Sequence, residues 1–369
     1  MDAREEIDAL VAFERRASGT DSERRAARHL ARRLEELGRE AEVENADCWP
    51  RWPLAFAAYL SLAVVGSVVS VSSPLAGAAL VLVAAALTFL EAAQIAPLAR
   101  RLLGRRATQN VVSREQDGKP GVIVLVAHLD AGRRAAAHGG RLRRLWPLPF
   151  VALGAVLACT LVRLTGLEGT VLTAIQFVPT TVLIATIPLL VDIALAEVAP
   201  GANDNASGVA AALALADRYG GRLEHFELWV LLTGAGESLA DGMRGFLRRR
   251  RKLLDRQSTV VIGLDGVGAG TVAYTRSRGH RQLVQLCEEI ATDDPGGLAF
   301  GARPVTDRAP SDAAAARGAG FPAINLGCRD EDDRVPERVE AAALARATAF
   351  AGELIGRLDA EVGPRFREP

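Results

Sequence analysis

The chain has 369 residues, enough for one large domain or two of ordinary size. Its 44 basic and 44 acidic residues give a formal net charge of zero, so the sequence shows no electrostatic footprint of a nucleic-acid-binding protein. The four cysteines are scattered without CxxC pairing, so neither a disulfide framework nor a zinc ribbon is predicted.

The N-terminal region has the character of a soluble protein. Its first residues are charged and lack the apolar stretch of a signal peptide. Apolar residues at helical spacing predict amphipathic helices over 3–15 and 21–37, and Thr20, Asp21 or Ser22 can cap the second helix.

Two apolar stretches interrupt this soluble pattern. No charged residue occurs between Arg51 and Glu91, and a Ser-Ser-Pro break divides the run into segments over about 54–71 and 75–93. A second pair follows over roughly 146–164 and 170–191. Each segment is close to the ~20 residues that cross a bilayer, so we expect two transmembrane hairpins. The alternative is two helical hairpins buried in a large core.

Arginines predict the orientation of these hairpins. Basic residues flank their outer ends, whereas the connecting turns carry only Arg163 and Glu168; the flanking residues are Arg51, Arg100, Arg101, Arg105, Arg106, Arg141, Arg143 and Arg144. Because such residues mark the cytoplasmic side, we expect a multi-pass protein of the cell membrane whose soluble segments all face the cytoplasm.

The apolar segments contain little that suggests transport. Glu91, Asp192 and Glu197 lie near segment ends, and the irregularities inside the spans are Gln176, Pro179 and Pro188. An ion or substrate pathway would normally show ionisable groups in the interior. We therefore interpret the hairpins as anchors in membrane lipid, with transport as the alternative.

Without the hairpins, the chain alternates strands and helices. Strands are expected over 39–45, 109–114, 121–127, 225–232, 260–265, 271–275 and 322–326, and helices over 205–219, 279–292 and 340–357. This order predicts an α/β fold with a mostly parallel mixed sheet sandwiched by helices. The expected domains are an α/β domain of 1–50, 107–140 and 200–369, one hairpin of 51–106 and a second hairpin of 141–199.

His128 and Asp130 follow the apolar run 121–127, which is typical of a buried central strand. In an extended chain their side chains point to the same side. A neutral imidazole beside a carboxylate suits a metal ligand and the group that orients it. Alone, the pair is as readily a structural hydrogen bond.

Three further carboxylates stand where α/β proteins place their ligands. Asp204 lies in a tight loop before a helix, while Glu237 and Asp265 come just past the ends of two strands. Individually they are as typical of helix caps and turns. Together, His128, Asp204, Glu237 and Asp265 form the mixture of nitrogen and oxygen ligands that suits zinc with open coordination positions.

An ordered series of motifs resembles metallopeptidase family 28, the bacterial dizinc aminopeptidases of clan MH. The motifs are GTDSERRAA from Gly19, VAHLDAG, GANDNASGV, TGAGES, GLDGVGAG and SDAAAARGAGFPAINLGC. The resemblance implies a zinc-exopeptidase-like fold in which His128 is a metal ligand and Asp130 orients it. It also implies that Asp204 bridges two ions and that Asp265 and Glu237 each bind one of them.

Two features depart from the family. The resemblance places the general base at position 236, where this chain has glycine, and no histidine follows His280 to supply the last metal ligand. One zinc position therefore keeps three expected ligands, while the other keeps Glu237 and a share of Asp204. Asp330, Glu331 or Asp332 could add to it, and His29, His138, His225 and His280 are weaker substitutes.

Two functions remain open from the sequence. One is a membrane-anchored zinc aminopeptidase, impaired by the two departures, in which a metal-bound water attacks a peptide bond of a short peptide or aminoacyl substrate. The other is a non-catalytic pseudopeptidase that serves as a peptide- or metal-binding scaffold. Because loss of a general base typically lowers the rate by about 10²–10⁴-fold, the sequence favours impairment.

Overall fold

The computed structural model describes residues 2–95, 98–135, 145–167, 169–277, 279–294, 300–306, 310–330 and 337–366. The chain divides into two compact units. The first, the α/β unit, consists of Met1–Cys48, Arg106–Gly132 and Val198–Pro369. The second, the helical unit, consists of Trp49–Arg105 and Arg133–Glu197.

An eight-stranded sheet forms the centre of the α/β unit, in the order β1-β2-β4-β3-β5-β8-β6-β7. The strands are β1 (Glu42–Cys48), β2 (Arg106–Ser113), β3 (Gly121–His128), β4 (Phe226–Thr233), β5 (Thr259–Leu264), β6 (Thr271–Thr275), β7 (Arg303–Val305) and β8 (Ala323–Arg329). The middle strands β4, β3, β5 and β8 are parallel, whereas β1–β2, β2–β4 and β6–β8 pair antiparallel. The predicted mostly parallel mixed sheet is confirmed.

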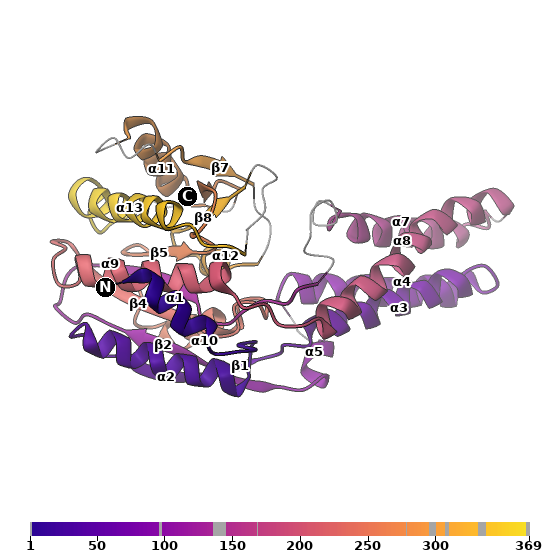
Figure 1. Cartoon of the computed structure of the whole chain (residues 1–369). Helices are drawn as coiled ribbons and strands as arrows, with labels where there is room; N and C mark the ends of the chain where they lie inside the picture. Colours follow the sequence, from indigo (N-terminus) through magenta and orange to yellow (C-terminus); the bar gives the residue numbers. More distant parts are fainter. Residues whose placement is uncertain are drawn as a thin grey trace. The chain divides into compact units, whose positions relative to one another are not determined.

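Helices cover both faces of this sheet (Figure 1). They are α1 (Ala3–Val11), α2 (Asp21–Glu36), α9 (Gly208–Tyr219), α10 (Asp241–Arg250), α11 (Arg281–Asp293), α12 (Asp312–Gly318) and α13 (Ala341–Arg357). Thr20 caps α2, because its side chain accepts a hydrogen bond from the Glu23 backbone N–H. The sequence did not predict α10, α12 or the short strand β7.

Alternation along the strands builds two hydrophobic cores. In β3, Ile123 and Leu125 face the core that holds α2, α9 and α13, while Val124 and Val126 face the core that holds α10 and α12. Every residue of β4 and β5 is buried. Because both faces are covered, these strands are continuously apolar, as central parallel strands are.

In the helical unit, the described residues form four apolar helices and one short helix. They are α3 (Trp52–Val69), α4 (Pro74–Ala92), α5 (Leu98–Leu102), α7 (Leu148–Arg163) and α8 (Thr170–Leu195). By length and composition, α3, α4 and α8 can each cross a membrane. The fourth predicted span, α7, is apolar but has 16 residues.

Polar side chains link the helices of this unit. Gln176 of α8 donates to Ser67 of α3 and to Ser70 just after α3, and it accepts a hydrogen bond from the Arg163 guanidinium of α7 at 2.9 Å. All four residues are buried. Gln176, the polar irregularity within the spans, is thus a structural connection between the two hairpins.

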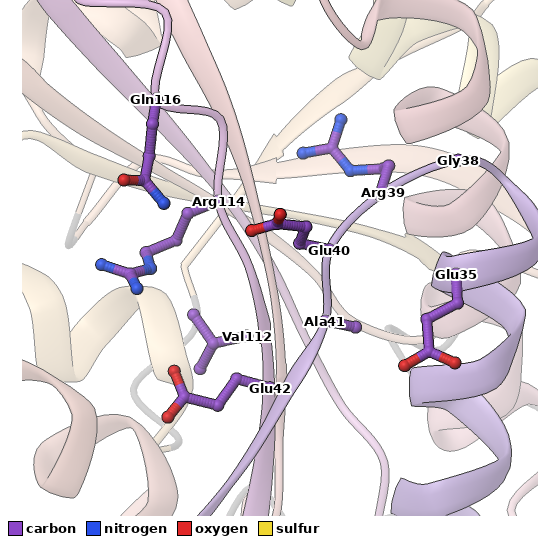
Figure 2. A pocket seen from close by; sticks show the side chains of 9 residues that line it. All are labelled: Glu35, Gly38, Arg39, Glu40, Ala41, Glu42, Val112, Arg114 and Gln116. Atoms are coloured by element: carbon purple, nitrogen blue, oxygen red, sulfur yellow. The ribbon is translucent and has the colours of Figure 1, made fainter.

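The α/β unit also contains an open hollow of about 500 Å³ beside β1 and the end of α2 (Figure 2). Its lining is Glu35, Gly38, Arg39, Glu40, Ala41, Glu42, Val112, Arg114 and Gln116. Arg39 is occupied with structural contacts, since its guanidinium binds Ser113, Glu115 and the carbonyl of Leu228. None of the predicted site residues lines this hollow.

Candidate metal centre

Three loops at the carboxyl ends of the parallel strands bring His128, Asp204 and Asp265 together. His128 ends β3, Asp265 directly follows β5, and Asp204 comes from the loop before α9. The Nε2 atom of His128 lies 3.2 Å from Oδ1 of Asp204 and 3.7 Å from Oδ1 of Asp265. One ligand atom from each residue lies within 4.8 Å of the other two.

These three residues fit a zinc ion. A tetrahedral ion with bonds of about 2.0–2.1 Å places its ligand atoms about 3.3 Å apart, close to the distances from His128. Oδ1 of Asp204 is buried, and the polar group that faces it is Nε2 of His128 at 3.2 Å. Because a buried carboxylate oxygen needs a positive partner, either the protonated imidazole or a bound cation satisfies it. One nitrogen and two oxygen ligands also suit zinc.

Asp130 lies behind His128 and not beside the other two carboxylates. Its Oδ1 is 3.3 Å from Nδ1 of His128, on the side of the ring away from Asp204. The carboxylate also accepts hydrogen bonds from the Ser18 hydroxyl and from the backbone N–H groups of Gly236 and Glu237. This position suits a group that orients the imidazole, as expected for Asp130.

The charges of the cluster shift its pKa values in opposite directions. Burial alone would lower the pKa of His128, but the carboxylates of Asp130, Asp204 and Asp265 around the ring raise it well above the usual value. Burial would raise the pKa of Asp265, but the hydrogen bond and charge of His128 hold it at about 2. Without a metal, the three carboxylates therefore favour the protonated form of His128.

Glu237 is half-buried and is not one of the three clustered residues. Its carboxylate lies over Gly132, where an added Cβ would be 3.0 Å from both Cδ and Oε1 of Glu237. Burial and the neighbouring charge of Asp204 raise the pKa of Glu237 to about 8. The fourth predicted ligand thus lies within electrostatic reach of the three clustered residues but outside their group.

Gly236 packs directly against His128. A Cβ at this position would lie 2.4 Å from Cβ and 2.5 Å from Cγ of the histidine. Real Cβ atoms do not approach so closely, so any side chain at 236 must displace His128. The glycine is therefore required by the local packing.

The loop that carries Asp204 is fastened to the loop that carries Asp265. The side chain of Asn205 donates to the carbonyl of Leu264 and accepts from Gly266 N, while Asn203 accepts from Gly268 N. Ser207 likewise accepts from Val267 N. The N-cap interpretation of this sequence is wrong, because α9 has no side-chain cap. The polar side chains at alternate positions 203, 205 and 207 are the sequence signal for this connection between the two loops.

Among the described residues, the histidines considered as alternative metal ligands do not lie at the metal centre. His29 binds Glu6, His225 binds Asp359, and His280 lies near Phe366 and Ala323 at the amino ends of the strands. Asp330 follows β8 and is not part of the three-residue group. His138, Glu331 and Asp332 lie outside the described residues.

The fold is that of zinc exopeptidases. A Zn-dependent exopeptidase from Parabacteroides distasonis superposes with a TM-score of 0.56 at 13% identity, over 97% of both chains. BSAP, a zinc aminopeptidase from Bacillus subtilis, gives 0.56 at 13% identity over 99% of this chain and 97% of that one. A glutaminyl cyclase from Porphyromonas gingivalis gives 0.55 at 13% identity over 96% of both chains.

The sequence comparison reaches the same group of proteins. Residues 188–348 match Peptidase family M28, a segment that contains Asp204, Glu237 and Asp265 but begins after His128. No curated protein matches the sequence significantly. The family is one of metallopeptidases, so zinc is the implied ion. The fold and the matched segment together confirm the resemblance of this chain to peptidase family M28.

Proposed function

We propose that the protein is a membrane-anchored zinc hydrolase of the aminopeptidase type, with one ion bound by His128, Asp204 and Asp265. The observation that carries this proposal is the convergence of these three ligand atoms within 4.8 Å of one another. The match of residues 188–348 to a peptidase family supplies the reaction class. The substrate class is a short peptide or an aminoacyl compound.

The residues around the ion have distinct tasks in this proposal. Bound zinc would polarise a carbonyl group and lower the pKa of a water molecule. Asp130 keeps the Nε2 atom of His128 directed toward Asp204, and the half-buried Glu237 is a carboxylate available for proton transfer or for a second ion. Because position 236 holds glycine, we expect hydrolysis about 10²–10⁴-fold slower than with a general base there.

A non-catalytic metal- or peptide-binding scaffold is the second candidate. It is favoured by the packing of Gly236 against His128, which leaves no space for a side chain at the position of the expected base. In this case zinc would stabilise the α/β unit without turnover.

Anchoring in the membrane is proposed from the helical unit. The apolar character of α3, α4 and α8 supports spans through lipid, with α7 as a shorter fourth segment. Arginines at the outer ends of the hairpins support a cytoplasmic α/β unit. The two hairpins correspond to insertions in one discontinuous domain.

Metal analysis of the purified full-length protein tests the proposal. We expect one equivalent of zinc, lost in Asp265→Asn, and slow cleavage of an aminoacyl-anilide that stops when zinc is removed. Asp330→Asn, at an acidic residue outside the cluster, is the matched control and should retain zinc. Two zinc ions with rapid cleavage would show an intact dizinc enzyme. Zinc without cleavage would favour the metal-binding scaffold, and no zinc would refute both the enzyme and the metal-binding scaffold.

A further inference from the structure

Arg16 is a buried arginine in the turn between α1 and α2. Only 1% of the residue is exposed. Its Nε donates to the carbonyl of Leu129 at 2.5 Å, one guanidinium nitrogen donates to the carbonyl of Leu10, and the other donates to the carbonyl of Gly201 at 3.2 Å. Its own carbonyl accepts from Ala131 N at 2.7 Å.

These contacts join two loops that supply metal ligands. Leu129 lies between His128 and Asp130, and Gly201 begins the loop that carries Asp204. The planar guanidinium fixes both carbonyls at once, which a more flexible cation does not do. The chain is tightly fitted here: a Cβ on Gly201 would lie 2.6 Å from Cβ of Ala131 and 3.1 Å from the guanidinium, and the φ angle of Gly201 is +68°.

The same turn makes further contacts with the centre. The Ser18 hydroxyl donates to Asp130 at 2.6 Å. The carboxylate of Glu23 accepts hydrogen bonds from Gly19 N and from Ala235 N, next to Gly236. Asp130, Glu23 and Glu337 are the acidic groups whose charges act on Arg16, so a buried cation balances carboxylates at the back of the site.

We infer that Arg16 is a positioning residue of the metal centre, which sets the separation of His128 from Asp204 without touching the ion. Asn203, Asn205 and Ser207 fasten the Asp204 loop to the Asp265 loop, and Arg16 supplies the corresponding link to the His128 loop. This inference rests on the proposed zinc site. Residues that orient metal ligands from behind typically contribute about 10–100-fold to metal affinity.

The first test compares zinc affinity in Arg16→Met and Arg16→Lys with the wild-type full-length protein, by competition with a chromophoric chelator. We expect both variants to bind zinc about 10–100-fold more weakly, because methionine has no donor and the single ammonium of lysine does not reproduce the planar spread of the guanidinium donors. Arg39→Met is the matched control. Arg39 is also mostly buried and bonded to a backbone carbonyl, that of Leu228, but its contacts are not to the ligand loops.

Comparison of the variants separates positioning from general stability. If Arg39→Met lowers the unfolding temperature of the metal-free protein as much as Arg16→Met yet retains zinc affinity, the inference holds. Wild-type affinity in both Arg16 variants would overturn it. If wild-type protein itself binds no zinc, the proposed function fails, a result distinct from failure of the inference alone.

A second test uses wild-type protein and does not depend on the folding of a variant. Coupling between two sites is reciprocal, so zinc must stabilise the turn if the turn stabilises zinc. We expect zinc to slow amide hydrogen exchange in the peptide over 12–20 and to leave the peptide over 36–42, which contains Arg39, unchanged. Equal exchange over 12–20 with and without zinc would overturn the inference.

Discussion

At the scale of single residues, Gly236 is the position where adding the expected general base would disturb the packing of a metal ligand. The resemblance to aminopeptidases suggests that Gly236→Glu would restore a base, but its Cβ would lie 2.4 Å from Cβ of His128. We therefore predict that Gly236→Ala and Gly236→Glu weaken zinc binding about tenfold or more, because the ligand is displaced. Chelator competition measures this effect.

The control for this prediction is Gly356→Ala in α13, where an added Cβ meets nothing within 4 Å. This change should leave zinc affinity unchanged and stabilise the helix by about 0.5–1 kcal/mol. Faster hydrolysis by Gly236→Glu at unchanged zinc affinity would contradict the packing argument.

The protonation of His128 predicts how zinc binding depends on pH. Despite burial, its carboxylate partners raise the pKa of this imidazole in the metal-free protein. Zinc requires the neutral ring, so protons compete and the affinity rises with pH, up to values above the ordinary histidine pKa of about 6.5. Asp130→Asn removes one partner and should move the midpoint to lower pH in a zinc titration series. The same midpoint in both proteins would show that Asp130 does not act on the ring.

Some residues of the site could be predicted from the sequence and others could not. His128, Asp204 and Asp265 were predictable, because strand ends gather ligands at one edge of a parallel sheet. Arg16 gave no signal, since its partners are backbone carbonyls 113 and 185 positions away. The close approach of Gly236 to His128 likewise exists only once β3 and the loop after β4 lie side by side.

At the scale of elements, Glu6 connects α1 to α2. This buried carboxylate accepts from His29 at 2.9 Å and Arg33 at 2.8 Å. Burial alone would raise the pKa of Glu6, but these bonds hold it below the usual value. We predict that Glu6→Gln destabilises the α/β unit by about 1–3 kcal/mol at neutral pH.

The pH dependence of this difference follows from the lowered pKa. The stabilisation is present above the unfolded-state pKa of about 4.3 and is lost as the pH falls through the lower folded-state value. Thermal unfolding of wild type and variant should therefore converge in acid. Glu36→Gln removes the exposed partner of the same Arg33 and should change little. An equal loss in both variants would contradict the assignment.

Close packing of α3 on α4 depends on small residues. A Cβ on Gly77 would lie 2.3 Å from Cα of Ser70, whereas a Cβ on Gly154 of α7 meets nothing within 4 Å. Since membrane helices associate through such small residues, we predict that Gly77→Leu lowers the unfolding temperature in detergent and that Gly154→Leu does not. Equal unfolding temperatures in the two variants would show that the packing of α3 on α4 does not depend on Gly77.

Elements with a clear period were predictable, and short or mixed ones were not. The apolar repeat of α2 and the apolar runs of β3 and β4 can be recognised in the sequence. In contrast, α10 contains Gly242 and Gly245 beside a run of arginines, which obscures its buried face. The three-residue strand β7 forms only through its pairing with β6.

At the scale of the whole molecule, the chain interrupts one α/β unit twice with apolar helices. The sequence predicted this arrangement because composition changes abruptly at both insertions. The parts of the α/β unit on either side of each insertion are in contact. After the first insertion, β2 pairs with β1. After the second insertion, the Asp204 loop contacts His128 at the end of β3. In the proposed membrane-anchored arrangement, both hairpins therefore return to the side of the membrane where they began.

This return predicts the topology in full. Because each hairpin leaves from and returns to the α/β unit, and arginines flank the outer ends, the turns near Ser72 and Thr165 should lie outside the cell. The four native cysteines are buried, so single exposed cysteines introduced by Ser72→Cys, Thr165→Cys and Asp117→Cys can be labelled selectively. A membrane-impermeant maleimide on intact cells should label the first two and reach Asp117→Cys only after lysis. Labelling of Asp117→Cys in intact cells would reverse the orientation, and labelling of all three only after lysis would contradict membrane crossing.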